Sequence, residues 1–115
     1  MGYFNIENRL TKICVCRYDY CLDSLVAGRS VVIITDTNIY ANYRELIERY
    51  DHIIIGVGEQ IKTLDTVGDI YSRLMSLRAD RSTLLIGVGG GIVTDITGFV
   101  AATYMRGVKF GFIST

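Results

Sequence analysis

Short apolar runs alternate with amphipathic segments along the middle of the chain. The runs Ser30–Asp36, His52–Val57 and Leu84–Val88 are rich in β-branched residues, which is typical of strands buried on both faces of a parallel sheet. The segments between them, Ile39–Tyr50 and Leu64–Leu77, carry apolar residues three and four positions apart, which predicts helices with one buried face. This order of strands and helices predicts a parallel sheet with right-handed crossovers.

The third apolar run ends in three consecutive glycines, Gly89–Gly91, and another amphipathic segment follows at once. Its apolar residues share one face at helical spacing, and they are Ile92, Ile96, Phe99 and Val100. We expect this helix to continue to about Tyr104, with a turn at Arg106–Gly107 and a last strand at Val108–Ile113. The whole pattern predicts an α/β, Rossmann-like domain over residues 1–115, with a mostly parallel sheet and helices on both faces.

The first part of the chain is weakly patterned. Between Tyr3 and Tyr20, Ile13 and Val15 indicate one strand of a peripheral hairpin. The cysteines of the chain are Cys14, Cys16 and Cys21. Their spacing could form part of a metal site, but a fourth ligand is missing because His52, the only histidine, is remote in the sequence. Reduced structural cysteines and a structural histidine are the favoured interpretation.

The glycine turn is the first candidate for chemistry. Glycine has no Cβ, so a ligand can approach the backbone closely, and a helix that begins there directs N–H groups at an anion such as phosphate. Gly87 and Gly89 match the first two glycines of the G-x-G-x-x-G dinucleotide motif, but Ile92 stands at the third position. No acidic residue follows Asp95, so a carboxylate for a ribose must come from upstream. The alternative is a glycine turn that binds nothing.

Polar residues follow two of the predicted strands at their carboxyl ends, where open α/β sheets bind ligands. Asp36 and Asn38 could contact a ribose or a base, or could form an Asx turn and a helix cap instead. Glu59 and Lys62 could hold a sugar hydroxyl, or could form an ion pair with each other. We expect Asp95 to be buried, because the segment around it is so apolar.

Composition narrows the class of protein. The chain has 115 residues, 50% of them hydrophobic, and a formal net charge of zero, so nothing suggests a nucleic-acid or acidic-membrane partner. No signal peptide is visible, and the longest uncharged run, Ser82–Thr94, is too short to cross a bilayer. We therefore expect a cytoplasmic protein. Because the pattern stops in a strand, we also expect the chain to be the N-terminal piece of a longer protein.

Four segments in this order resemble the 3-dehydroquinate synthase family of NAD- and zinc-dependent enzymes. They are TDTN (Thr35–Asn38), GEQIK (Gly58–Lys62), GVGGGIVTDITGFVAATYMRG (Gly87–Gly107) and the strand that ends at Thr115. The resemblance covers about residues 30–115, and its long third segment is highly specific. It implies that the chain is the NAD-binding domain of such an enzyme.

The resemblance also implies roles for single residues. The implied cofactor-binding residues are Asp36, Asn38, Glu59, Lys62, Gly90, Gly91, Ile92, Asp95 and Thr115. Asp36 and Asn38 would lie at the adenosine end, Glu59 and Lys62 near the ribose groups, residues 90–92 against the pyrophosphate, and Asp95 beside the nicotinamide ribose. Arg106 would bind the substrate phosphate across the interface of a homodimer, a role that suits a guanidinium because it stays charged and forks onto two oxygens.

The implied reaction converts 3-deoxy-D-arabino-heptulosonate 7-phosphate into 3-dehydroquinate and phosphate, with no net redox change. The zinc ligands of the family, a glutamate and two histidines, have no counterpart here, so zinc or another divalent metal would bind in a missing C-terminal domain and this chain alone would be inactive. The alternatives are another NAD-dependent sugar-phosphate cyclase, a glycerol-dehydrogenase-like metal-dependent alcohol dehydrogenase, and a stand-alone nucleotide-binding or regulatory module.

Overall fold

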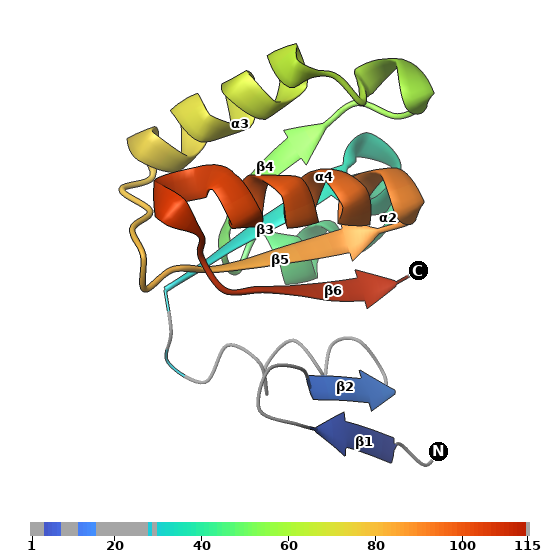
Figure 1. The fold of residues 1–115 in the computed structure, drawn as a ribbon. Helices are drawn as coiled ribbons and strands as arrows, with labels where there is room; N and C mark the ends of the chain where they lie inside the picture. The colour runs from blue at the N-terminus through green and yellow to red at the C-terminus, as the bar shows by residue number, and fades with distance from the viewer. Residues whose placement is uncertain (1–3, 8–11, 16–27, 29, 115) are drawn as a thin grey trace.

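A parallel four-stranded sheet forms the centre of the molecule (Figure 1). The computed structural model describes residues 4–7, 12–15, 28 and 30–114. The sheet has the order β4-β3-β5-β6, and its strands are β3 (Val31–Asp36), β4 (Asp51–Ile55), β5 (Leu84–Gly89) and β6 (Phe110–Ser114). Its helices are α2 (Thr37–Ile47), α3 (Leu64–Ser76) and α4 (Gly91–Thr103). The predicted α/β fold is confirmed.

The strand order reverses direction beside β3. The chain passes from β3 outward to β4, then returns to place β5 on the other side of β3, with Thr35 opposite Val88. The crevice that opens at the carboxyl ends of the strands, where the order reverses, is the usual ligand site of such sheets. Thr35 also closes this junction, because its buried hydroxyl donates a hydrogen bond of 2.8 Å to the Val88 carbonyl.

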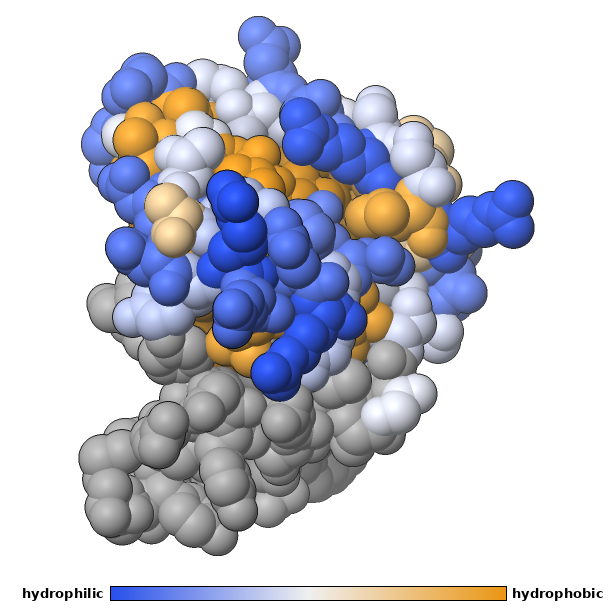
Figure 2. Space-filling view, turned by 180° about the vertical axis from the view of Figure 1, so that it is seen from behind, coloured by the Kyte–Doolittle hydropathy of each residue, from blue (hydrophilic) through white to orange (hydrophobic). Residues whose placement is uncertain are grey.

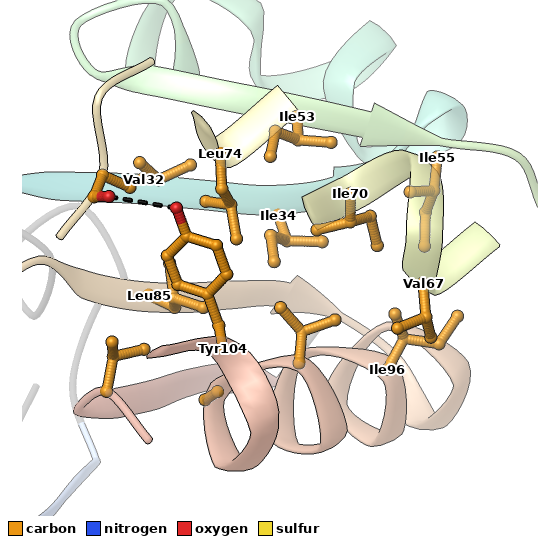
Figure 3. Packing of buried hydrophobic residues seen from close by; sticks show 14 of the residues in the cluster. Val32, Ile34, Ile53, Ile55, Val67, Ile70, Leu74, Leu85, Ile96 and Tyr104 are labelled. Carbon is orange, nitrogen blue, oxygen red and sulfur yellow. Dashed lines mark hydrogen bonds between the residues drawn. The ribbon is translucent and has the colours of Figure 1, made fainter. Parts of the chain in front are cut away.

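Helices cover both faces of the sheet. The apolar faces of α3 and α4 pack on one side in a cluster that includes Ile34, Ile70 and Leu85, all with no exposed surface (Figure 3). Tyr104 closes this cluster at one end, since its hydroxyl donates a 3.0 Å hydrogen bond to the Ala79 carbonyl. The β-branched strands thus bury side chains in both directions, as the unbroken apolar runs predict.

Helix α2 covers the other face. Ile33, Ile86 and Ile47 form the centre of this second cluster. Seen from behind, this side of the molecule carries polar side chains across its middle and apolar surface above and below them (Figure 2). His52 lies at the edge of this layer, where its Nδ1 is 2.9 Å from the Tyr50 carbonyl oxygen and its ring stacks on Tyr40 at 5.8 Å. This packing agrees with the structural role predicted for His52.

Two side chains assigned to buried helix faces are exposed. Leu64, the first residue of α3, is 77% exposed, and Phe99 of α4 is 48% exposed. The buried face of α4 consists instead of Val93, Ile96, Thr97, Val100 and Ala101. Phe99 fits the helical spacing of the predicted buried face. The face that actually packs on the sheet is centred on Val93 and Val100, so Phe99 lies at its border.

A separate antiparallel hairpin precedes the sheet, as predicted. It pairs β1 (Phe4–Glu7) with β2 (Lys12–Val15). Cys16 and Cys21 lie outside the described residues, and of Cys14 only the backbone in β2 is described. The prediction of structural cysteines therefore stays a prediction.

Helix α4 packs unusually close to β5. A Cβ placed on Gly87 would lie 2.6 Å from Thr97 Oγ1, so only glycine allows this approach. The Thr97 side chain is completely buried, and its hydroxyl has no hydrogen-bond partner in the part of the chain that the structure describes. A buried hydroxyl without a partner costs free energy.

We expect Thr97→Val to raise the free energy of unfolding by about 1 kcal/mol, because it removes an unpaired buried hydroxyl at nearly constant volume. The matched control, Thr35→Val, removes a satisfied hydroxyl in the same core and should lower it by about 1 kcal/mol. Urea unfolding of both variants measures the two changes. Equal destabilisation by both substitutions would mean that the Thr97 hydroxyl has a partner in solution.

Candidate functional site

A pocket with a volume of about 140 Å³ opens where the carboxyl ends of β3, β4 and β5 meet. Its lining residues are Asp36, Gly56, Val57, Gly58, Gly90, Gly91, Ile92 and Val93. They come from the end of β3, the turn after β4 and the first turn of α4. The pocket therefore lies in the crevice where the strand order reverses.

The glycine turn forms one wall of the pocket. Gly89 has a φ of +155°, and a Cβ there would lie 2.9 Å from Val93, so the fold itself requires this glycine. A Cβ on Gly90 or Gly91 would meet no protein atom within 4 Å. The space that these two residues leave open is space that a ligand can occupy.

Helix α4 begins at this wall without a side-chain cap. Gly90 is its N-cap residue and offers no side chain, so the N–H groups of the first turn keep their hydrogen-bonding capacity. No acidic residue lies in that first turn. Uncapped N–H groups and the positive end of the helix dipole favour an anion at this point of the pocket.

Asp36 forms part of the opposite wall and has a structural task as well. It is the N-cap of α2, where its Oδ1 accepts a 2.8 Å hydrogen bond from the Ile39 amide. The Asx-type interpretation is thus correct for Asp36, whereas Asn38 lies inside α2 and does not cap it. Within the described residues Oδ2 of Asp36 has no partner, so one carboxylate oxygen is left for a ligand.

Lys62 and Asp95 do not line the pocket, but they form an ion pair between two of the elements that do. Lys62 Nζ lies 2.8 Å from Asp95 Oδ2, which joins the turn after β4 to α4. The suggested pair between Glu59 and Lys62 is therefore wrong: Lys62 bonds to the residue 33 positions ahead. This contact brings together two of the residues that the resemblance assigned to the ribose groups.

The expectation of a buried Asp95 is also wrong, since its side chain is 60% exposed. Successive helical residues turn by about 100°, so Asp95 lies about 200° from the buried Val93 and faces away from the sheet. The segment is apolar because the opposite face of α4 is buried against the sheet. Asp95 is paired at the surface, where the Lys62 side chain reaches its carboxylate.

The turn that carries Lys62 is fixed by its own contacts. Gly58 has a φ of +95°, and a Cβ there would lie 2.3 Å from the Gln60 side chain. Gln60 Nε2 donates a 3.0 Å hydrogen bond to the Val57 carbonyl, and Ile61 packs against the core. Glu59 is exposed at the start of this turn, in the short 3-10 helix η1 (Glu59–Ile61).

Arg106 lies far from the pocket. Helix α4 separates the two, and its 13 residues correspond to about 20 Å. Arg106 ends the 3-10 helix η2 (Tyr104–Arg106), is exposed and has a left-handed φ of +68°. A single chain does not bring Arg106 to the other candidate residues, and Thr115 lies outside the described residues.

Four lining residues, Gly56, Val57, Gly58 and Val93, were not among the predicted site residues. The first three continue directly from β4, and Val93 is in the first turn of α4. The rule that ligands bind beyond the carboxyl ends of strands could have identified those first three. Val93 serves both the core and the pocket, and its spacing indicates only the core.

Across the described residues, no three histidine, cysteine or acidic side chains come close enough to hold a metal ion. The described residues therefore offer no site for a divalent metal, which the resemblance assigns to a further C-terminal domain. Within the same residues no helix is long and apolar enough to span a membrane.

A family described as 3-dehydroquinate synthase N-terminal matches residues 52–115, more than half of the chain. The chain belongs to this family. The match begins at β4 and includes the turn with Lys62, the glycine turn and all of α4.

Relatives in the 3-dehydroquinate synthase family share much of the sequence. The 3-dehydroquinate synthase of Clostridium acetobutylicum is 43% identical over an alignment of 97 residues that covers 77% of this chain and 27% of that protein. The enzyme of Clostridium tetani is 39% identical over an alignment of 111 residues that covers 91% of this chain and 29% of that protein. The chain thus spans less than a third of the length of these curated relatives.

Solved structures of other proteins have a similar fold. A 2-deoxy-scyllo-inosose synthase has a TM-score of 0.75 at 22% identity and covers 99% of this chain and 36% of its own, a likeness that shows the fold alone. Another structure of a 2-deoxy-scyllo-inosose synthase, complexed with carbaglucose-6-phosphate, NAD+ and Co2+, is 26% identical with a TM-score of 0.66, over 82% of this chain and 30% of its own.

The ion pair with Asp95 changes the pKa of Lys62. The hydrogen bond to Asp95, followed by the charge of Asp95, raises the pKa of Lys62 above its ordinary value, and Glu59 adds a smaller contribution. Because the pKa of Lys62 is raised on folding, the stabilisation by the pair is complete below the ordinary lysine pKa and is lost as the pH rises through the raised value. Lys62 therefore keeps its positive charge at neutral pH.

We expect Asp95→Asn to lower the pKa of Lys62 towards its ordinary value, because it removes the charge that favours the ammonium form. NMR titration of the Lys62 side chain measures the change. Glu59→Gln is the control and should lower this pKa less. Identical Lys62 titrations in the wild type and Asp95→Asn would show that the pair does not form in solution.

Proposed function

We propose that the chain is the NAD-binding portion of a 3-dehydroquinate synthase. The complete enzyme would convert 3-deoxy-D-arabino-heptulosonate 7-phosphate into 3-dehydroquinate and phosphate, as a lyase of aromatic amino acid biosynthesis. The observation that carries the proposal is the pocket between Asp36 and the uncapped start of α4, in a chain of this family. The NAD+ in a solved relative at 26% identity supports the same cofactor.

The pocket suits a dinucleotide at both walls. The pyrophosphate would lie against Gly90, Gly91 and Ile92, where free N–H groups and the absence of Cβ atoms allow a close approach. The Oδ2 of Asp36 would accept hydrogen bonds from ribose hydroxyls at the adenosine end, with Asn38 beside it on α2. When bound, NAD would supply the hydride acceptor for transient oxidation of the substrate.

Lys62 and Asp95 would act on the second ribose as a pair. Their ion pair neutralises both charges beside the pocket, and each has remaining hydrogen-bonding capacity for a hydroxyl, with Glu59 nearby in the same turn. Thr115 follows β6 and would line the cofactor from the next strand. These roles come from the family resemblance, and the contact between Lys62 and Asp95 supports the joint role of these two residues.

The remaining parts of the reaction would come from outside this chain. The metal ligands would lie in a further C-terminal domain. Arg106 would bind the substrate phosphate in the pocket of a second subunit, since in its own chain α4 holds it about 20 Å away. The proposal therefore includes a homodimer.

A second candidate is another sugar-phosphate cyclase. The likeness to 2-deoxy-scyllo-inosose synthase, one structure of which holds a sugar phosphate analogue and NAD+, favours this alternative over an alcohol dehydrogenase. Both candidates use the same cofactor pocket, so they differ only in the substrate.

Asp36 allows its structural and binding roles to be separated. Asn is as good an N-cap as Asp, so Asp36→Asn should keep the free energy of unfolding within about 0.5 kcal/mol, whereas Asp36→Ala should lower it by about 1 kcal/mol. Both should weaken NAD binding about tenfold, because neither keeps the free carboxylate oxygen. Calorimetric titration and urea unfolding provide the two measurements. Unchanged NAD affinity in Asp36→Asn would leave Asp36 with the capping role alone.

The enzymatic activity can be tested in a chimera. The chain would replace the matching segment of the Clostridium acetobutylicum 3-dehydroquinate synthase, to which it is 43% identical. We expect phosphate release from 3-deoxy-D-arabino-heptulosonate 7-phosphate that requires NAD. Gly90→Val should abolish it by filling the pyrophosphate space, whereas Gly111→Val, also at an open position but on β6, should not.

A folded chimera that binds NAD but releases phosphate only from a hexose 6-phosphate would favour the second candidate. A folded chimera that does not bind NAD would contradict the proposal for both.

A further inference from the structure

The two main walls of the pocket differ in how firmly they are attached to the rest of the chain. The start of α4 is fixed, because Thr97 and Val93 lie so close to β5 that a Cβ on Gly87 or Gly89 would lie within 3 Å of them. Both side chains are buried. A wider or narrower pocket therefore requires movement of the opposite wall, the turn of residues 57–62 after β4.

This turn, residues 57–62, is attached mainly to itself. Its backbone hydrogen bonds run from the Ile61 amide to the Gly58 carbonyl at 3.2 Å and from the Lys62 amide to the Glu59 carbonyl at 3.0 Å. None of its residues is buried, and only Ile61 packs against the core cluster. A segment with few buried contacts has low local stability. The turn can therefore move as a unit while its internal bonds are kept.

The pocket is narrow when the turn lies as the structure shows it. Its volume of about 140 Å³ is below the roughly 300–1,000 Å³ of most small-molecule sites. Gly58, with its φ of +95°, lies at the pocket end of the turn and offers a hinge where the backbone direction can change. A bulky ligand would therefore enter and leave more easily when the turn moves away from α4.

The Lys62–Asp95 ion pair controls this movement by its position. Within the part of the chain that the structure describes, it is the one polar contact that joins the turn to another element. Both side chains are partly exposed, at 44% and 60%, so the pair can open without disturbing the core. An exposed ion pair changes an equilibrium by up to about fivefold. That is a large effect for a turn with one apolar anchor besides.

We propose that the Lys62–Asp95 pair is a positioning device, which holds residues 57–62 against α4 and so sets the rate at which the cofactor leaves. This role goes beyond the ribose contacts of the two side chains. It depends on their opposite charges and on the link between two elements, and it does not depend on which side carries which charge. The identity of the cofactor rests on the proposed function, whereas the position of the turn is a property of this chain alone.

Backbone ¹⁵N relaxation of the 115-residue chain without cofactor tests the link itself. We expect Asp95→Asn to lower the order parameters of residues 57–62 from about 0.85, typical of rigid backbone, towards about 0.6. Lys62→Asp combined with Asp95→Lys should restore them, because the pair is rebuilt in reverse. The matched control is Asp69→Asn, which breaks an exposed pair with Arg73 inside α3 and should leave the turn unchanged.

The dissociation rate of NADH, followed by its fluorescence, tests the effect on the cofactor. Asp95→Asn should speed dissociation about threefold, and the charge-exchanged double variant should return it to within about twofold of the wild type. Asp69→Asn should leave the rate unchanged. Direct ribose contacts alone predict a different result, since the double variant would then stay as impaired as Asp95→Asn.

Unchanged order parameters or an unchanged dissociation rate in Asp95→Asn would overturn this inference, and so would a double variant that behaves like the single one. A folded chain that binds no NADH would contradict the proposed function instead. The order parameters of the cofactor-free variants would then still decide whether the pair positions the turn.

Discussion

The close contact between α4 and β5 is the constraint on which the rest of the structure depends. Gly87 and Gly89 remove two Cβ atoms from the strand, so Thr97 and Val93 of the helix can lie directly against its backbone. The helix is thereby aligned with the strand, and its uncapped first turn faces the crevice between β3 and β5. Displacement of α4 by one larger side chain would move one wall of the pocket and one end of the loop with Arg106 together.

Much of the fold follows from the sequence because its signals are local. Unbroken β-branched runs predicted the buried parallel strands, and the alternation with amphipathic segments predicted the crossovers. The glycine turn and Asp36 were identified because a strand end is a fixed place in such a sheet. Periodicity was wrong for residues at the border of a helical face. Spacing assigns Phe99 to the core, but the buried face of α4 is centred on Val93 and Val100, and Phe99 is half exposed.

The pairing of charges could not be predicted in the same way. Lys62 and Asp95 are 33 residues apart, and only the packing of α4 over the turn after β4 brings them to 2.8 Å. Sequence proximity favoured Glu59, which is the wrong partner. The family resemblance assigns roles to Lys62, Asp95 and Arg106 without indicating that the first two meet each other and that the third lies beyond the opposite end of a helix. These relations are tertiary, so they depend on distances that no local pattern contains.

The strand order also determines when the sheet can form during synthesis, because β3 pairs with the later strand β5. The central pair of the sheet joins β3 to β5, with Thr35 bonded to a residue 53 positions later, while β4 lies outside that pair. Pairings so distant in sequence form slowly, because a long loop must close before any contact repays the lost entropy. During synthesis β3 therefore keeps one open edge until β5 has left the ribosome. A nascent chain that pauses before Gly89 therefore exposes an unpaired edge of the apolar strand β3, to which other chains can add.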